Sequence, residues 1–138
     1  MTFLLSMLLS TATYGAGEGW FTNIDKATAK AKEEGKTLLL EFHGSDWCPP
    51  CIQLNKEVFA SDDFKAFAED KLIAVDLDFP RKKEQSAEQK SHNKELASKY
   101  GVRGFPTVIL ISPDGSVKNK SVGYSDKDEF WQFLKDNS

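Results

Sequence analysis

The sequence predicts an α/β fold in which helices pack on a mixed central sheet of about four strands. Two apolar runs of strand length are separated by a helical pattern, an order that requires parallel strands joined by a right-handed crossover. Two further runs flank a tight-turn sequence, so we expect them to pair as an antiparallel hairpin. With 138 residues, 40% of them hydrophobic, the chain has enough apolar material for one packed core and too little length for two ordinary domains.

The first elements expected along the chain are a helix and a buried strand. Thr22 followed by Asp25 resembles a capping box, and Gly35 stands where the helix would end. Thr37–Phe42 is a short apolar run interrupted only by Glu41, which favours a buried strand. The helix is therefore expected to finish just before this strand starts.

A second helical segment and a second buried strand follow. Pro49 suits the first turn of a helix, where its missing N–H needs no partner, and Ser61 is placed to cap the continuation. Leu72–Leu77 again has the composition of a buried strand. The polar stretch Arg81–Lys94 is interpreted as an insertion within the domain, and its charge run Arg81–Lys90 as a solvated helix face. The helical pattern stops at Gly101.

The last elements are expected to be a hairpin and a helix. Thr107–Ile111 and Ser116–Val122 flank Ser112–Gly115, whose residues suit a tight turn. Because these two strands would be antiparallel while the earlier pair is parallel, the sheet is mixed. Ser125 with Asp128 forms a capping pattern for the final helix.

Composition and charge exclude several classes of protein. With a formal net charge of −3 and lysines that alternate with acidic residues, the chain has no basic patch, so nucleic acid is not an expected partner. The only two cysteines are separated by two residues and cannot form the several disulfides that stabilise small secreted domains. They must be explained as a local pair.

The N-terminal segment is expected to be a secretory signal peptide. Phe3–Leu9 is apolar and leads into the small-residue stretch Ala12–Gly17, as in the core and cleavage region of such a peptide. Residues 1–17 are therefore assigned to it and residues 18–138 to one domain, which places the protein in the periplasm or otherwise outside the cytoplasm. The positively charged start is missing, since the first lysine is Lys26. Without a signal peptide the protein would be cytoplasmic.

Cys48 and Cys51 have the spacing and position of a redox dithiol. A cysteine at a helix N-terminus experiences the partial positive charge of unpaired amides, which stabilises the thiolate and makes the sulfur nucleophilic. Cys48 holds this place, and Cys51 lies one helical turn further, within reach for a disulfide and more buried. In the expected cycle Cys48 attacks a substrate disulfide and Cys51 resolves the mixed disulfide.

Two separated motifs resemble those of the thioredoxin superfamily. The first is Trp47-Cys48-Pro49-Pro50-Cys51 after a strand, and the second is Tyr100-Gly101-Val102-Arg103-Gly104-Phe105-Pro106-Thr107. The resemblance spans Trp20–Leu134 in the order of elements and implies the thioredoxin fold, a three-layer α/β/α sandwich. Gly44–Cys48 and Leu54–Phe59 further resemble exported bacterial thioredoxin-like proteins and the C-terminal domain of the membrane-linked Dsb reductase.

The resemblance implies roles for residues around the dithiol. Pro106 would follow a cis peptide bond and face the two sulfurs, so that the neighbouring backbone pairs with an extended substrate segment. Phe105 and Thr107 would flank the dithiol, and Trp47 with Pro49 would complete the surface that meets a substrate. No metal or organic cofactor is required for exchange between a dithiol and a disulfide.

By the same resemblance, Glu41 is the candidate for the buried acid that helps to deprotonate the second cysteine. It stands one residue further from Cys48 than the usual spacing, and Ala74 occupies the place of the lysine that partners the acid in thioredoxin. The alternative is a surface carboxylate at the edge of the strand. The sequence leaves the choice between the two open.

The two histidines are the only further soft donors for a metal. A closed zinc site needs four ligands, so zinc held by both cysteines, His43 and His92 is not favoured. His92 is interpreted as a solvated residue of the charged insertion. His43 is interpreted as a structural residue at the end of a strand, although it could tune the Cys48 thiolate or bind copper together with both sulfurs.

The sequence therefore predicts a monomeric thiol-disulfide oxidoreductase that reduces disulfides in exported proteins. Pro49 stands where thioredoxin has glycine, so neither residue between the cysteines offers an N–H to the Cys48 sulfur, which favours a reductant over a strong oxidant. Its partners would be proteins with disulfides and a membrane electron donor of the Dsb reductase type.

Two alternative functions remain. One is a copper-binding metallochaperone that uses His43, Cys48 and Cys51, and the other is a non-catalytic binding module. An isomerase is not favoured, because no residues are left for a dimerisation segment.

Overall fold

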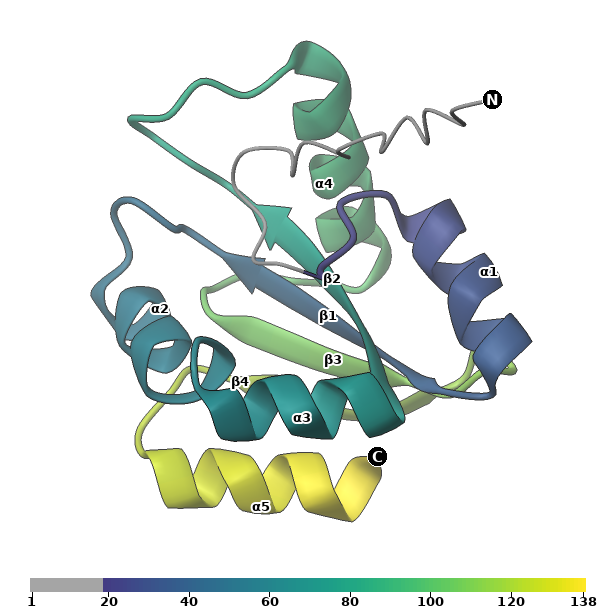
Figure 1. The fold of residues 1–138 in the computed structure, drawn as a ribbon. Coiled ribbons are helices and arrows are strands. Elements are labelled where there is room, and N and C mark those ends of the chain that lie inside the picture. Colours follow the sequence, from purple (N-terminus) through teal and green to yellow (C-terminus); the bar gives the residue numbers. More distant parts are fainter. Residues whose placement is uncertain (1–18) are drawn as a thin grey trace, which may run out of the picture.

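The computed structural model describes residues 19–138, which contain a four-stranded sheet covered by helices on both faces (Figure 1). The strands are β1 Thr37–His43, β2 Leu72–Asp78, β3 Thr107–Ile111 and β4 Val117–Val122. They lie in the order β2-β1-β3-β4. β1 is parallel to β2 and antiparallel to β3, and β3 is antiparallel to β4, so the mixed sheet expected from the sequence is confirmed.

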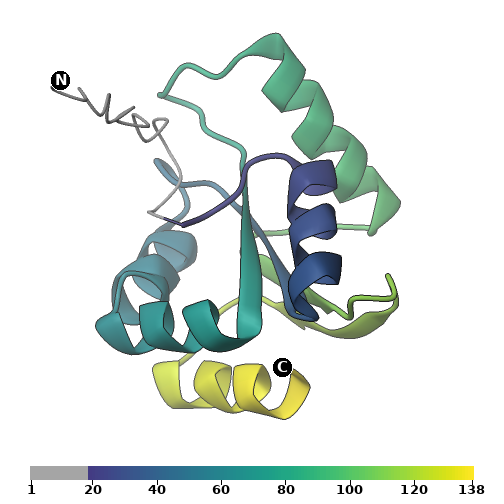
Figure 2. The ribbon, with the colours of Figure 1, turned by 45° about the vertical axis from the view of Figure 1, so that its right-hand side comes forward.

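Within this part of the chain, five α-helices and one π-helical turn surround the sheet. They are α1 Ile24–Glu34, α2 Pro49–Leu54, the π-helical turn η1 Asn55–Phe59, α3 Asp62–Lys71, α4 Ala87–Lys99 and α5 Lys127–Asn137. α1 and α4 cover one face, and α2, α3 and α5 cover the other (Figure 2). This is the three-layer sandwich of the thioredoxin fold. None of the helices described is long and apolar enough to cross a membrane.

The ends of the helices follow from the local sequence, with two corrections to the expected caps. α1 is capped by the side chain of Asn23 and not by Thr22. α5 is capped by Asp126 and not by Ser125. In both cases a strong capping residue stands directly after the expected one and accepts the first-turn N–H instead. Gly35 ends α1 in the left-handed conformation with φ 65°, as predicted.

Two apolar clusters hold the layers together, one on each face of the sheet. The first includes Ala27, Ala31, Leu38, Leu40, Phe42, Val75 and Leu96, and the second includes Leu39, Leu54, Val58, Phe64, Phe130 and Leu134. Successive side chains of β1 alternate between these clusters. On the face of Leu39, however, the next two positions are Glu41 and His43, which are buried although they are titratable. The apolar core therefore gives way to polar groups at the C-terminal end of β1.

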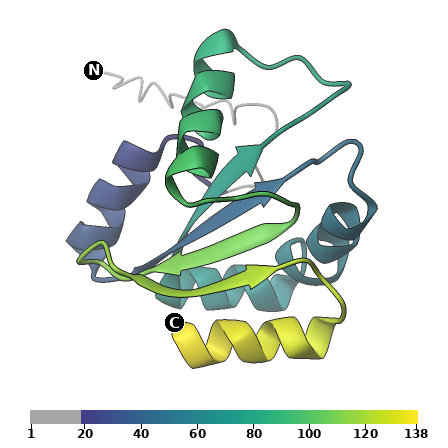
Figure 3. The same cartoon turned by 180° about the vertical axis from the view of Figure 1, so that it is seen from behind.

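The two edges of the sheet differ. Phe21 covers the edge of β2, since its N–H donates to Ala74 and its carbonyl accepts the N–H of Asp76. β4 forms the opposite edge, and no strand of residues 19–138 pairs with its outer side (Figure 3). Val117 and Val122, at its two ends, are 52% and 67% exposed.

The charge run Arg81–Lys90 is mostly exposed, as expected, but only partly helical, which corrects the expectation of a helix along all of it. α4 begins at Ala87 after its cap, Ser86, so the preceding residues form a loop that leaves β2. His92 is not simply a solvated residue either, because its Nε2 accepts the N–H of Ile24 at 3.0 Å. This hydrogen bond joins α4 to the start of α1.

Candidate active site

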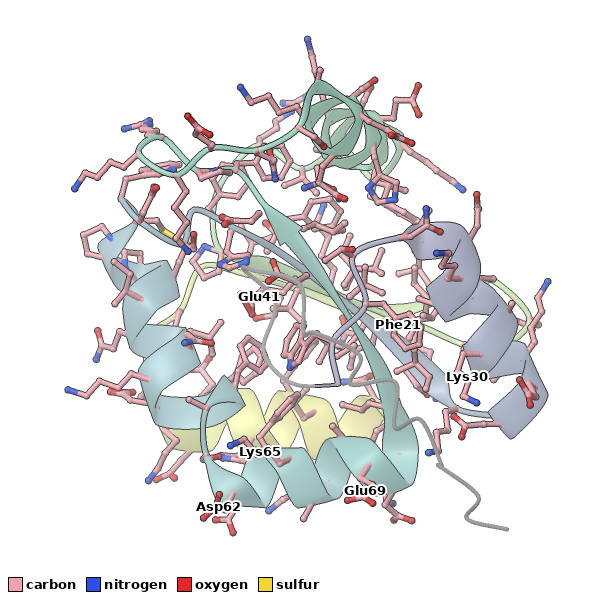
Figure 4. All side chains as sticks on the ribbon, turned by 45° about the horizontal axis from the view of Figure 1, so that its top comes forward. Phe21, Lys30, Glu41, Asp62, Lys65 and Glu69 are labelled. Carbon is pink, nitrogen blue, oxygen red and sulfur yellow. A yellow bond between two sulfur atoms is a disulfide. The ribbon has the colours of Figure 1, made fainter. Side chains whose placement is uncertain are left out.

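Cys48 and Cys51 lie at the start of α2 and are joined by a disulfide, with their Cα atoms 5.3 Å apart (Figure 4). Cys48 is the N-cap of α2, and its carbonyl accepts the N–H of Ile52 at 3.0 Å. Pro49 and Pro50 fill the first two helical positions, so the first N–H of the helix belongs to Cys51. Cys48 is 4% exposed and Cys51 is 1% exposed, which agrees with the expected order of burial.

Trp47, the residue directly before Cys48, is held by a set of close contacts. It packs so tightly on Gly44 that a Cβ at that position would lie 2.5 Å from the indole Nε1. The same nitrogen donates to the carbonyl of Phe79 at 2.7 Å. The indole meets Phe105 edge to face with ring centroids 5.8 Å apart, and the Arg81 guanidinium lies 3.6 Å from its ring centroid. The residue before the first cysteine is therefore fixed by several neighbours.

Two acidic side chains tie the end of β2 and the loop after it to the loop before α2. Asp46 accepts three consecutive N–H groups, those of residues 81–83, at distances of 2.7 to 2.9 Å. These hydrogen bonds, above all the one from Arg81, lower the pKa of Asp46 to about 2. Asp78 accepts both the N–H and the hydroxyl of Ser45. Both loops beside the disulfide are thus held by carboxylates.

The peptide bond between Phe105 and Pro106 is cis and lies directly before β3. The Pro106 carbonyl accepts the N–H of Gly123 at 2.8 Å. The N–H and C=O of Phe105, by contrast, make no hydrogen bond within residues 19–138. Because Phe105 also packs on Trp47, the cis peptide lies at the same end of the sheet as the disulfide.

The other residues expected to meet a substrate differ in their accessibility. Pro49 is exposed, and Trp47 and Phe105 are half-buried. Thr107 is 1% exposed, and its hydroxyl donates to the carbonyl of Gly104 at 2.8 Å. Its side chain is therefore committed to the turn before β3.

A buried cluster of three titratable side chains stands at the C-terminal ends of β1 and β2. His43 lies between two carboxylates, with Nδ1 3.1 Å from Glu41 Oε1 and Nε2 2.6 Å from Asp76 Oδ1. Glu41 pairs with Asp76 in the parallel register, and His43 follows two residues later on the same face. Glu41 is only 3% exposed, on the face covered by α2 and α3 (Figure 4). The alternative of a surface carboxylate for Glu41 is therefore wrong.

Burial and mutual charge change the proton affinities of this cluster. Burial raises the pKa of Glu41 to about 7, although the positive charge of His43 opposes the rise. Burial would lower the pKa of His43, but the Glu41 carboxylate and the hydrogen bond to Asp76 outweigh it and raise that pKa to about 9. Both ring nitrogens face carboxylate oxygens, an arrangement that a doubly protonated, cationic imidazole satisfies.

A cavity of about 370 Å³ joins this cluster to the second cysteine. Its lining includes Glu41, His43, Asp76, Cys51 and Lys65, the last of which comes from α3. Within the described residues, Oε2 of Glu41 is buried and has no hydrogen-bond partner. The space is large enough to hold water between Glu41 and Cys51. Cys51 and Glu41 therefore line one space that water can enter.

The described part of the chain brings together no group of three or more His, Cys, Asp or Glu side chains suited to a metal ion. The set His43, Cys48 and Cys51 of the copper alternative is thus not assembled. Both nitrogens of His43 are instead engaged by carboxylates. His92 binds a backbone N–H in a different part of the fold.

Three residues of the site, namely Asp76, Asp46 and Arg81, were not assigned from the sequence. Asp76 left a weak signal, as an acidic residue inside an apolar strand like Glu41, but only the strand register places the two together. Asp46 and Arg81 belong to loops, and nothing in the sequence indicates that residues 35 positions apart meet.

The fold and the dithiol together define a protein of the thioredoxin class. Residues 24–138 match the family model for a thioredoxin-like domain, so the chain belongs to this family. The resemblance inferred from the two motifs is thereby confirmed.

Two relatives come from Chlamydia pneumoniae. The disulfide bond reductase DsbH is 40% identical over 90 residues, which are 65% of this chain and 54% of that protein. The thioredoxin-related protein DsbJ is 31% identical over 116 residues, or 80% of this chain and 33% of that protein. The chain therefore spans only part of the length of these relatives.

Solved structures agree with this assignment. A DsbH oxidoreductase superposes with a TM-score of 0.76 at 30% identity, covering 94% of this chain and 91% of that one. The oxidised C-terminal domain of DsbD from Neisseria meningitidis gives a TM-score of 0.61 at 21% identity, covering 83% and 91%. The second likeness shows the fold alone.

Proposed function

We propose that this protein is a thiol-disulfide oxidoreductase that reduces disulfides in other proteins. The observation that carries the proposal is the Cys48–Cys51 disulfide, formed at the N-terminus of α2 and next to a cis-prolyl peptide. The 40% identity to a disulfide bond reductase supports the same chemistry. No metal or organic cofactor takes part, because two thiols supply both electrons.

The reaction starts from the reduced dithiol. The Cys48 thiolate attacks one sulfur of the substrate disulfide, forms a mixed disulfide and releases the other substrate sulfur as a thiolate. Cys51 then attacks the Cys48 sulfur, which closes the protein disulfide and releases the second substrate sulfur. The protein loses two electrons and the substrate gains them, while the thiol protons end on the substrate sulfurs by way of water.

The substrate would dock along the cis peptide. The unpaired N–H and C=O of Phe105 can pair with an extended segment as a short strand, with Pro49 and Trp47 offering apolar surface beside the sulfur. Thr107 would contribute through its backbone only, since its hydroxyl is bound to Gly104.

Glu41 is the proton acceptor in the second half of this cycle. Its pKa of about 7 lies between those of an ordinary carboxylate and an ordinary thiol, as a base for the Cys51 thiol requires at neutral pH. The cavity that Cys51 and Glu41 both line, together with the unpartnered Oε2, supports this role.

Reduction of insulin disulfides, driven by dithiothreitol, tests the function. We expect the wild-type protein to accelerate insulin precipitation and Cys48→Ser to abolish the acceleration. Cys51→Ser should instead accumulate a mixed disulfide, because the resolving thiol is missing. A wild-type protein that binds insulin without reducing it would support the binding module and refute the enzyme.

The direction of electron flow is a further part of the proposal. With no N–H from residues 49 and 50 available to the Cys48 sulfur, we place the protein among reductants, recharged by a membrane electron donor of the Dsb reductase type. Equilibration in glutathione buffers tests this, because a reduction potential near that of strong oxidants would reverse the proposed direction.

Residues 1–17, which lie outside the described residues, would act as a signal peptide for export. N-terminal sequencing of the protein from the periplasmic fraction would find a start near residue 18 if they do.

A further inference from the structure

The cluster beside Cys51 contains more than the one acid that the proposed cycle uses. A single buried carboxylate would suffice to accept a proton. Here His43 separates two carboxylates and bonds to both, at 3.1 Å from Glu41 and 2.6 Å from Asp76. Burying three titratable groups costs stability unless each is paired, so their arrangement calls for a role.

We propose that His43, held in place by Asp76, is a positioning residue that keeps Glu41 able to accept the proton of Cys51. This inference rests on the proposed function, and it concerns the step in which Cys51 resolves the mixed disulfide. Ala74 stands where thioredoxin has a lysine, so a cation near the acid must come from another position. His43 supplies it from the same strand as Glu41.

The geometry assigns separate tasks to the two oxygens of Glu41. Oε1 is bound by the Nδ1 of His43, which fixes the orientation of the carboxylate. Oε2 is buried, has no partner among residues 19–138 and belongs to a side chain that lines the cavity with Cys51. A proton arriving from Cys51 would therefore be taken up at Oε2, while His43 remains bound to the other oxygen.

Asp76 holds the other nitrogen of His43. Nε2 is 2.6 Å from Asp76 Oδ1, and both residues are buried. With a carboxylate on each side, the ring keeps both of its protons and its positive charge. Asp76 therefore acts on Glu41 through His43 and takes no part in the transfer itself.

The other charged groups around Glu41 do not replace this cation. On β2, Asp76 and Asp78 oppose the ionised form of Glu41, whereas His43 favours it. Lys65 of α3 and Lys83 of the loop after β2 line the same cavity, but no ion pair between either lysine and Glu41 is formed. Cys51 is the remaining titratable neighbour, and it becomes an anion during the step.

The proton and electrons balance without a further reactant. The Cys51 thiol passes its proton to Oε2 of Glu41, directly or through water, and its thiolate attacks the Cys48 sulfur. The substrate thiolate leaves with the electron pair of the broken bond. Glu41 then returns its proton to water, which protonates the leaving group.

The test follows the release of thionitrobenzoate from Ellman's reagent by the reduced protein, in which the second equivalent reports the attack of Cys51. For His43→Gln we expect this phase to be about tenfold slower at about pH 7 and to recover to the wild-type rate above about pH 9, because Glu41 then needs a higher pH to ionise. His92→Gln, the matched control at the only other histidine, should retain the wild-type profile. Equal slowing at every pH, or an unchanged profile, would overturn the proposal.

A second measurement does not depend on turnover or on the folding of His43→Gln. The ring resonances of His43 are titrated by NMR in the wild-type protein, in Glu41→Gln and in Asp76→Asn. We expect the pKa of His43 to fall by at least about one unit in each variant, because each removes a neighbouring carboxylate. An unchanged pKa would overturn the coupling. If the wild-type protein couples in this way but reduces no insulin, the proposed function fails while the coupling stands.

Discussion

Replacing Glu41 with glutamine should make the oxidised protein more stable at neutral and alkaline pH. The pKa of Glu41 is about 7 in the folded protein, against an ordinary value of 4.5. As the pH rises between these values, the unfolded chain releases its proton while the folded protein retains it, so the free energy of unfolding falls. A difference of this size corresponds to about 3 kcal/mol lost by the time the pH exceeds the folded value.

His43 adds to the same trend. Its pKa is raised from 6.5 to about 9, so its contribution is complete below the lower value and is lost as the pH rises toward the higher one. Glutamine at position 41 keeps a similar shape but removes both the titrating carboxyl and the largest of the charges that raise the pKa of His43, while Asp76 and Asp78 remain. The variant should therefore lose much less stability with rising pH than the wild type does.

Urea unfolding of the oxidised protein, followed by tryptophan fluorescence at about pH 5 and about pH 9, measures the difference. We expect Glu41→Gln to lose about 3 kcal/mol less than the wild type between these two pH values, because the variant lacks the Glu41 carboxyl. Glu84→Gln, at an exposed position in the loop after β2, is the matched control and should behave like the wild type. A wild-type profile that is flat over this range would refute the assignment of a buried, proton-retaining carboxyl.

Three further changes test the surroundings of the disulfide and the core. Gly44→Ala should displace the Trp47 ring, change its fluorescence and cost about 1–3 kcal/mol, because the new methyl group would overlap the indole. Phe64→Ala, at a side chain 1% exposed and packed among aromatic rings, should lower the free energy of unfolding in urea by about 3–5 kcal/mol. Asp46→Ala should speed hydrogen exchange of the amides of residues 81–83 by about tenfold, whereas Glu84→Ala should leave it unchanged. In the wild type the protection of the same amides, measured as the ratio of intrinsic to observed exchange rate, should fall as the pH falls toward about 2, where Asp46 is protonated and its hydrogen bonds weaken.

The elements of the fold were predictable because each left a local pattern. The strands at Thr37–His43 and Leu72–Asp78 are apolar runs bounded by polar residues, and the structure extends each by one residue beyond the predicted end. The N-cap residue was predicted wrongly where two strong capping residues are adjacent, as Thr22 and Asn23 are. The π-helical turn at Asn55–Phe59 was not predicted, because its residues were expected only as part of one helical segment.

The active site was predictable in its covalent chemistry and not in its acid-base chemistry. Cys48 and Cys51 are close because only Pro49 and Pro50, in the first turn of α2, separate them, which is a local constraint. The neighbours of Glu41 depend on the parallel register of β1 with β2, in which a shift of one residue would turn Asp76 to the other face of the sheet. Such a register is fixed by the whole core, so His43 could be placed at the end of a strand but not between two carboxylates.

The exposed edge of β4 carries positive charges that oppose its pairing with the same strand of a second molecule. Lys118 and Lys120 stand between the two exposed valines, and their ammonium groups reach the Thr37 hydroxyl and the Tyr100 carbonyl at 3.1 and 3.3 Å. If the β4 edges of two molecules paired, the lysine ammonium groups of both would lie close together and repel each other. This repulsion would oppose strand pairing between two copies of the protein along β4.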